Sequence, residues 1–205
     1  MSDRDLGKAL RTLAPPGILV DHRLISPGDE HALLTEETGA FRRSAVEVRR
    51  ASGAARIVAR TLIERLGHQR PALAKSPAGP PIWPEGVLGS LAHDSSIAVA
   101  AVTARANLAG IGIDIEPAEL LPAELLEIVT TPRERASLAA DPHRGRLFFV
   151  AKEAVYKAVF PRDQTFLDHH DVEIDLSNQT ARLRDGRAVC LRFCQSSHLV
   201  ALAFF

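Results

Sequence analysis

The sequence predicts a fold of mixed helices and strands, in which each half of the chain has one main helix and several strands. Two observations predict it: the helical apolar spacing of residues 41–66 and 145–160, and the short apolar runs on both sides of these segments. The 205 residues are 46% hydrophobic and carry no formal net charge, which is typical of a globular protein. This length suffices for one large domain or for two small ones that share a core.

In the first half, residues 1–30 predict a strand (GILVDHRLI, 17–25) that enters a loop, and residues 41–66 predict a helix without proline. Gly67 is positioned as the C-cap of this helix. Its apolar residues near helical spacing are Ile57, Leu62, Ile63 and Leu66.

Residues 70–86 contain five prolines and are expected to be irregular. Residues 97–105 (IAVAAVTAR) predict a buried strand, because they are apolar and partly β-branched. Asn107 suits a turn into the next strand, residues 110–117, so that the two strands would form a hairpin.

In the second half, residues 131–140 predict a short helix with Thr131 as N-cap, Pro132 at the first position and Glu134 at the third. A longer helix is predicted at residues 145–160, and Pro161 is expected to end it. The remaining strands are predicted within residues 171–176, within 181–193 on both sides of a turn at Asp185-Gly186, and within 198–205.

The chain shows no signal peptide near its N-terminus and no apolar run of the roughly 20 residues that a membrane span needs. Its two cysteines, Cys190 and Cys194, have no metal-ligand company and are expected to be core residues. These features predict a cytoplasmic protein without a membrane partner.

Charge is unevenly distributed. Residues 41–70 contain eight arginines against two glutamates, an excess of six positive charges. Each of these arginines alone is explained by a solvent-exposed helix surface, but the eight arginines together favour an anionic partner. A nucleic acid is not expected, because aromatic residues do not alternate with the arginines and no DNA-binding pattern is present.

The stretch GIGIDIEP, residues 110–117, places two carboxylates in an apolar strand. Because strand side chains alternate, Asp114 and Glu116 share one face with Gly112, roughly 7 Å apart at Cα, while isoleucines occupy the other face. Like charges this close favour a cation between them. Oxygen ligands without His or Cys favour Mg²⁺ over zinc.

The stretch AKEAVYKAV places Glu153 and Lys157 on one helix face. An ordinary salt bridge would explain this pair, yet the chain has only four lysines against 21 arginines, and Lys152 and Lys157 both fall here. The use of lysine here, in a chain that otherwise uses arginine, favours a compact cation that holds a phosphate. In GSLAHD, Ser90 and His93 are either anion contacts or plain turn residues.

The order of GSLAHD, GIGIDIE and FFVAKEAVYK strongly resembles the 4'-phosphopantetheinyl transferases, specifically the larger, monomeric class that includes the surfactin and enterobactin activating enzymes. Residues 53–67 and the loop GPPIWPEGVLGS are similar to the enterobactin type. The resemblance covers residues 41–170. It implies an α+β fold of two similar halves, 1–106 and 107–205, each a main helix packed on a small antiparallel sheet, with the active site in the cleft between them.

The resemblance also implies the reaction: transfer of phosphopantetheine from coenzyme A to a serine of an apo acyl or peptidyl carrier protein, with release of adenosine 3',5'-bisphosphate. The implied cofactor is Mg²⁺, with Mn²⁺ as an alternative ion. The carrier protein's acidic helices would meet the arginine-rich region. Whether the carrier serves fatty acid, polyketide, peptide or siderophore synthesis stays open.

By match to the family's motifs, Asp114, Glu116 and Glu153 are metal ligands, and Glu153 is also a candidate base. Lys157 matches the lysine that contacts the pyrophosphate and protonates the leaving phosphate. The remaining expected contacts to coenzyme A are Ser90, His93, Lys152, Arg56 and Arg70. A metal-bound carboxylate is a poor base, so either Glu153 leaves the metal or a water on the metal takes the serine proton.

One departure from the family is Ala92, where relatives often have a serine; Ser90 or Ser95 would have to supply that hydroxyl. Two other functions stay open: a catalytically silent module that binds coenzyme A or a carrier protein, and another Mg²⁺-dependent phosphotransferase or phosphohydrolase. Against the latter, the chain has no P-loop and no kinase signature. Trp83 and Tyr156 are expected to be packing residues, and His169-His170 a loop.

Overall fold

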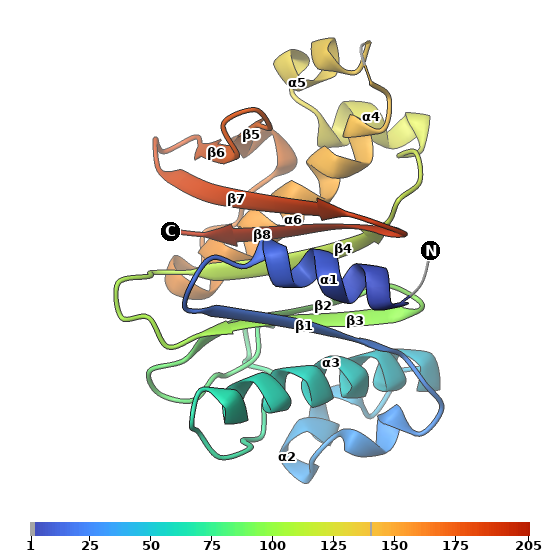
Figure 1. Cartoon of the computed structure of the whole chain (residues 1–205), viewed down its shortest axis with the longest axis vertical. Coiled ribbons are helices and arrows are strands. Elements are labelled where there is room, and N and C mark those ends of the chain that lie inside the picture. The colour runs from blue at the N-terminus through green and yellow to red at the C-terminus, as the bar shows by residue number, and fades with distance from the viewer. Residues whose placement is uncertain (1–2, 140) are drawn as a thin grey trace.

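The computed structural model describes residues 3–139 and 141–205. It contains two antiparallel sheets, each packed against one helix of 20 residues (Figure 1). The elements of the first half are α1 (Asp3–Leu13), β1 (Ile18–Leu24), η1 (Asp29–Ala32), α2 (Thr35–Thr38), η2 (Gly39–Phe41), α3 (Val46–Arg65), β2 (Leu88–His93) and β3 (Ile97–Thr103).

The second half begins with β4 (Ile111–Pro117), and its long helix is α6 (Arg144–Asp163). Its other elements are α4 (Ala123–Val129), α5 (Pro132–Ser137), η3 (His169–Asp171), β5 (Val172–Asp175), β6 (Thr180–Leu183), β7 (Ala188–Gln195) and β8 (His198–Phe204). Among the described residues, no helix has both the length and the hydropathy to cross a membrane.

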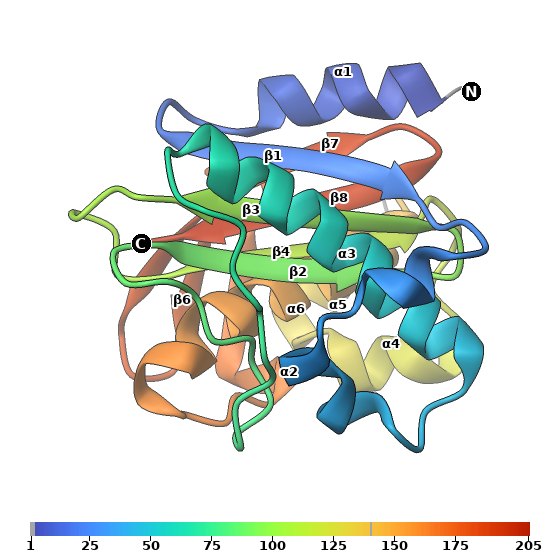
Figure 2. The same cartoon turned by 90° about the horizontal axis from the view of Figure 1, so that it is seen from below.

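The first sheet has the strand order β1-β3-β2, and α3 crosses one of its faces (Figure 2). All seven residues of β3 are buried, as expected for a central strand covered on both faces. Gly67 follows α3 at a φ of 89°, and its N–H donates to the carbonyl of Glu64. Gly67 therefore ends the helix as a left-handed glycine, but one position beyond the C-cap, which is Leu66.

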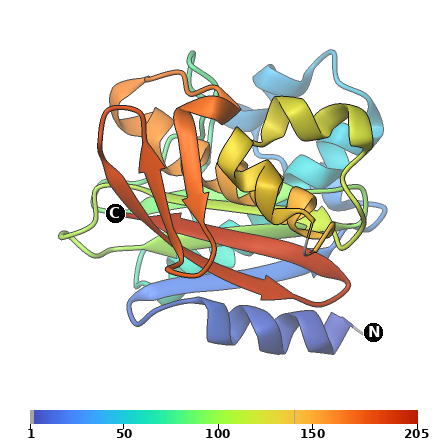
Figure 3. The ribbon, with the colours of Figure 1, turned by 90° about the horizontal axis from the view of Figure 1, so that it is seen from above.

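The second sheet has the order β4-β8-β7-β6-β5, and α6 lies against it (Figure 1). Helices α4 and α5 lie beside α6 and close one end of this layer (Figure 3). The predicted capping box of α5 is confirmed, because Thr131 and Glu134 exchange hydrogen bonds.

The two sheets meet where β2 lies beside β4, and they share a hydrophobic core there. Ile111, Ile113 and Ile115 of β4 pack in this core together with α1 and β1. The hydroxyl of Ser90 in β2 accepts a hydrogen bond of 3.1 Å from the backbone N–H of Ile113. The junction therefore places residues of both halves side by side, and the α+β architecture is as expected.

Several predictions about elements were wrong. The expected hairpin of residues 97–105 and 110–117 does not form, because β4 pairs with β8 from the end of the chain. Helix α1 was missed, and the GSLAHD stretch is largely the strand β2. Helix α6 continues to Asp163 beyond Pro161, since a proline in the last turn removes only one hydrogen bond. Cys190 is exposed rather than core.

Candidate active site

Strand β4 lies directly on α6, and two glycines make this approach possible. A Cβ on Gly112 would overlap the carbonyl oxygen of Ala154, and one on Gly110 would overlap that of Ala158. Asp114 lies two residues beyond Gly112, so it faces the same helix. The predicted alternation along β4 is confirmed, and it brings Asp114 to the residues of the KEAVYK motif.

Asp114 is buried, and its Oδ1 lies 2.6 Å from the Nζ of Lys157. Its other carboxylate oxygen, Oδ2, is also buried and has no hydrogen-bond partner among the described residues. Burial raises the pKa of Asp114 against the opposing effect of Lys157, and the charge of Glu153 raises it further. The site thus holds more negative charge than Lys157 alone neutralises.

Glu116 is paired with a residue that the sequence analysis did not single out. The Nη1 of Arg146 lies 2.9 Å from Oε2 of Glu116, and Nη2 donates to the carbonyl of Leu120 at 3.1 Å. Burial and the charge of Asp114 raise the pKa of Glu116, while Arg146 lowers it. Nothing in the local sequence around Arg146 could have indicated this pairing, because the two residues are 30 positions apart.

Glu153 lies beside His169, whose Nε2 is 3.4 Å from the carboxylate oxygen Oε1. The imidazole ring stacks against Phe149, with 5.8 Å between ring centroids. The interaction with His169 lowers the pKa of Glu153, and the charge of Lys157 lowers it further, against burial. His169 belongs to the short helix η3, so treating it as a loop residue missed a neighbour of the motif.

These acids form a set of hard oxygen donors, which is the chemistry that Mg²⁺ prefers. The buried, unpartnered Oδ2 of Asp114 fits a cation at this point. In this structure each acid has its own basic partner, and no three acidic, His or Cys residues within 3–139 and 141–205 are gathered as a metal cluster. The residue types therefore fit a divalent ion, which would bind beside the contacts that these acids make with Lys157, Arg146 and His169.

The first half contributes Ser90 and His93 from β2, next to β4. Desolvation of its ring lowers the pKa of His93 against the carbonyl of Asp94, and the nearby charge of Lys157 lowers it further. Asp94 in turn pairs with His198 of β8 at 2.7 Å, which links the end of β2 to the second sheet. Polar groups from both halves therefore lie near the seam, the junction where β2 of the first sheet lies beside β4 of the second.

Lys152 has partners within the chain. Its ammonium is buried and has three acceptors at 2.7–2.8 Å: the carbonyls of Val129 and His169, and Oε2 of Glu134. A lysine has only three donors, and all are used here. The expected phosphate contact of Lys152 stays a prediction, and it would have to replace one of these hydrogen bonds.

The two arginines expected near coenzyme A also have partners within the chain. Arg56 is buried and donates to the carbonyl of Leu73 at 3.0 and 3.1 Å, and burial lowers its pKa. Arg70 is exposed and lies 2.7 Å from Glu64. Their contacts to coenzyme A stay predictions, and both would have to be made beside these existing interactions.

Comparison with known proteins gives the site its context. Residues 36–103 match a family model described as the 4'-phosphopantetheinyl transferase N-terminal domain, and residues 110–203 match the 4'-phosphopantetheinyl transferase superfamily. The 4'-phosphopantetheinyl transferase Npt of Nocardia iowensis is 36% identical over 182 residues, which cover 87% of this chain and 79% of that protein. The chain belongs to the 4'-phosphopantetheinyl transferases.

Two further relatives support this membership. The 4'-phosphopantetheinyl transferase Svp of Streptomyces mobaraensis is 38% identical over 85% of this chain and 76% of its own length. Enterobactin synthase component D of Salmonella typhimurium is 38% identical over 88 residues, or 40% of this chain and 36% of its own. The predicted family and its enzymatic character are therefore confirmed: this is a transferase, of a family that modifies carrier proteins with phosphopantetheine.

A small cavity of this transferase, about 160 Å³, opens beside Lys157 at the junction of the halves. Trp83, Gly89 and Leu91 line it from the first half, and Tyr156 and Phe160 line it from α6. Tyr156 and Phe160 stack on each other, with 5.1 Å between centroids. Tyr156 and Trp83 pack as expected, but both also border a cavity next to the motif lysine.

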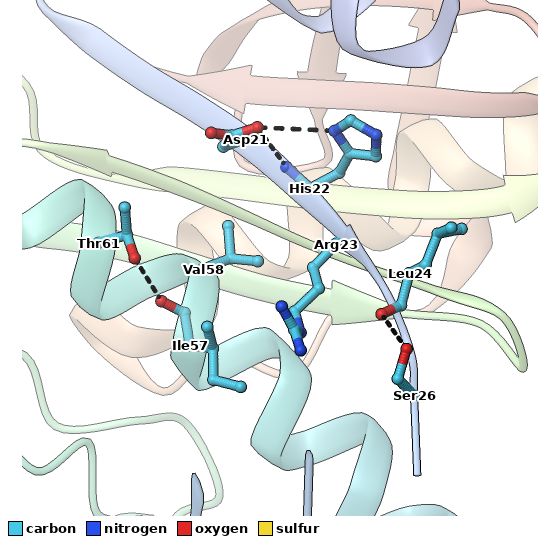
Figure 4. Close-up of a pocket in the computed structure, with 8 residues that line it drawn as sticks. All are labelled: Asp21, His22, Arg23, Leu24, Ser26, Ile57, Val58 and Thr61. Carbon is cyan, nitrogen blue, oxygen red and sulfur yellow. Dashed lines mark hydrogen bonds and ion pairs between the residues drawn. The ribbon is translucent and has the colours of Figure 1, made fainter. Parts of the chain in front are cut away.

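A second groove of the transferase, about 400 Å³, lies between β1 and α3 (Figure 4). Strand β1 forms the edge of the first sheet opposite β2. Asp21, Arg23 and Thr61 are among its lining residues, and none of the predicted site residues is. The groove is therefore separate from the acids of β4 and α6.

Proposed function

We propose that the chain transfers 4'-phosphopantetheine from coenzyme A to a serine of an apo acyl or peptidyl carrier protein, with Mg²⁺ as its cofactor and adenosine 3',5'-bisphosphate as the second product. One observation carries the proposal: Asp114 of β4 contacts Lys157 of α6, and its buried Oδ2 has no hydrogen-bond partner among the described residues. Carboxylates and a lysine in one site suit a pyrophosphate bound to a divalent ion.

The metal would be held by Asp114, Glu116 and Glu153, with Mn²⁺ as an alternative ion. When bound, it would neutralise charge on the pyrophosphate and orient it. Asp114 and Glu116 reach the site from β4, and Glu153 reaches it from α6. Because burial already raises the pKa of Asp114 and of Glu116, a cation would stabilise both carboxylates.

Lys157 serves as a compact positive charge for the phosphate that leaves. Its side chain is 30% exposed, so it can exchange its contact with Asp114 for one with a ligand. In the reaction, the serine oxygen forms a bond to the β-phosphorus of coenzyme A, and the bond from this phosphorus to the bridging oxygen breaks. The leaving phosphate of adenosine 3',5'-bisphosphate accepts a proton from Lys157.

The serine proton goes to Glu153 or to water beside it. Contact with His169 lowers the pKa of Glu153, so its carboxylate is a weak base at neutral pH but still a stronger one than free water. The Nε2 of His169 lies 3.4 Å from the carboxylate oxygen Oε1 of Glu153.

The first half would bind the adenosine bisphosphate end of coenzyme A through His93, Ser90, Arg56 and Arg70. In the arginine-rich segment, several side chains have internal partners, among them Arg50 with Glu30 and Arg60 with Glu37. The exposed arginines that remain for an acidic carrier protein are Arg42, Arg43 and Arg65. The two free cysteines suit a cytoplasmic enzyme, and we expect it to be a monomer by size-exclusion chromatography.

Intact-mass spectrometry of an apo carrier protein tests the proposal. The carrier is incubated with coenzyme A and the enzyme in four arms: with Mg²⁺, with EDTA, with the Asp114→Ala variant, and with the Arg144→Met variant as a surface control. We expect a gain of one phosphopantetheine unit with Mg²⁺ and with Arg144→Met, and none in the other two arms. Binding of coenzyme A without any mass gain on several carriers would instead favour the silent binding module.

A further inference from the structure

Arg146 connects three parts of the second half of the chain. It lies in the first turn of α6, and its side chain is 15% exposed. Nη1 contacts Oε2 of Glu116 at the end of β4, and Nη2 donates to the carbonyl of Leu120 in the segment that follows β4. A planar guanidinium with two contacts of 2.9 and 3.1 Å fixes direction as well as distance.

Glu116 needs such a restraint because two other acids lie near it. It shares the face of β4 with Asp114, and the charge of Asp94 also acts on it. Its side chain is 25% exposed, so repulsion would otherwise turn the carboxylate toward solvent. Among the residues that the structure describes, Arg146 is the cation within ion-pair distance of Glu116.

The segment held by Nη2 is itself packed against the start of α6. Leu121 is buried in the core of the second half, and a Cβ on Gly145 would come within 3.4 Å of it. The position of Arg146 relative to β4 is therefore set by packing and not by the ion pair alone. This makes Arg146 a rigid support for Glu116.

We propose that Arg146 is a positioning residue of this transferase, which holds the Glu116 carboxylate toward Asp114 so that both can bind the divalent ion. The inference rests on the proposed function, because it needs an ion at these acids. Partners that orient metal-binding carboxylates typically change metal affinity or activity by about 10- to 100-fold when removed.

A purely electrostatic role would have the opposite effect. A cation that only competes with the metal for Glu116 would weaken metal binding, so its removal would tighten it. A positioning role predicts weaker binding after removal, since Glu116 would lose its orientation. The sign of the change in metal affinity therefore separates the two roles.

The experiment is direct Mn²⁺ binding to the metal-free full chain, followed by electron paramagnetic resonance of free Mn²⁺. Three variants are compared with the unaltered chain: Arg146→Met, Arg146→Lys, and Arg144→Met as a matched control. Arg144 lies two residues away on α6, and its nearest acidic atom, in Asp141, is 3.9 Å away. We expect the Mn²⁺ dissociation constant to rise about 10- to 100-fold in Arg146→Met, less in Arg146→Lys, and not at all in Arg144→Met.

Transfer kinetics and thermal unfolding accompany the binding measurement. In Arg146→Met, saturating Mg²⁺ should restore most of kcat, and the KM for coenzyme A should stay unchanged; a general loss of structure would not show this pattern. Unchanged or tighter Mn²⁺ binding by Arg146→Met would overturn the inference while transfer by the unaltered chain remains. Absence of Mn²⁺ binding by the unaltered chain, or binding that survives Asp114→Ala, would instead overturn the proposed metal site.

Discussion

The fold acts differently on the three acids of the site. Burial raises the pKa of Asp114 and Glu116, whereas contact with His169 lowers that of Glu153. Ionisation of Asp114 and of Glu116 therefore lowers the stability of the folded protein, whereas ionisation of Glu153 raises it. Acids kept at such a cost are typical of functional sites.

Glu116→Gln should raise the thermal unfolding temperature of the metal-free protein at pH 8 and lower its transfer activity. The folded pKa of Glu116 lies above the unfolded value, so the folded chain binds more protons between these values, and its stability falls as pH rises through them. The neutral amide removes this loss. Calorimetry in EDTA between pH 4 and 8 measures the effect.

The gain from Glu116→Gln should shrink as pH falls through the raised pKa and vanish below 4.5, where glutamate becomes protonated in both the folded and the unfolded state. Glu85→Gln, on the Pro-rich segment, is a control without an expected change. A variant that is less stable than the unaltered chain at pH 8 would mean that the contact with Arg146 outweighs burial.

At this scale the sequence predicted the acids but not their partners. Asp114, Glu116 and Glu153 could be named because strand and helix periods place them on defined faces. Arg146 is 30 positions from Glu116, and His169 is 16 positions from Glu153. The period of a single helix or strand cannot predict contacts at such separations. For Lys152, the helical period predicted the element but not its three acceptors, because these come from elements distant in sequence.

Among the elements, α4, α5 and η3 are held to α6 by one buried ion pair. Lys152 is 2% exposed, and Glu134, which pairs with it, also accepts the backbone N–H of Ile174 at 2.8 Å and that of Thr131 at 2.9 Å. The network is fully hydrogen-bonded, which is the condition under which buried charges persist.

Lys152→Met should lower the free energy of unfolding by about 3–5 kcal/mol, because it leaves the charge of Glu134 buried and unpaired. Urea unfolding of the metal-free protein measures this. The double variant Lys152→Met with Glu134→Gln should recover part of the loss, since it removes that charge. If Lys152→Met were as stable as the unaltered chain and only phosphate binding suffered, the internal role would be wrong.

The close contact of β4 with α6 gives a second prediction about elements. Gly112→Ala should cost about 1–3 kcal/mol of stability through overpacking. It should also reduce transfer, because α6 must move away from Asp114. Gly39→Ala is the control, since a Cβ there meets nothing within 4 Å. Wild-type stability and activity of Gly112→Ala would contradict the described contact.

Local patterns predicted α3, α6 and the strands after α6, but not the pairing of β4. Strand pairing with β8 depends on packing across the chain, whereas a turn after residue 105 looked locally sufficient for a hairpin. Helix α1 was detectable: Leu6, Leu10 and Leu13 recur at helical spacing and are all buried. The division at residues 106 and 107 stays a prediction.

For the whole molecule, the seam between the sheets positions the site. The shared core contains residues of α1, β1, β2 and β3 from the first half and of β4 and β8 from the second. Ser90 and the Asp94–His198 pair connect the halves at the same seam. Groups expected to bind coenzyme A and acids expected to bind the metal are therefore placed in one structural unit.

The most direct test of a shared site for metal and coenzyme A is the affinity of the metal-free enzyme for coenzyme A, measured by calorimetry with and without Mg²⁺. Two ligands that meet in one site must change each other's affinity by the same factor. We predict that Mg²⁺ tightens coenzyme A binding about tenfold or more, which is a coupling of about 1.4 kcal/mol, and that Asp114→Ala abolishes this gain. Equal affinity for coenzyme A with and without Mg²⁺ would contradict the account.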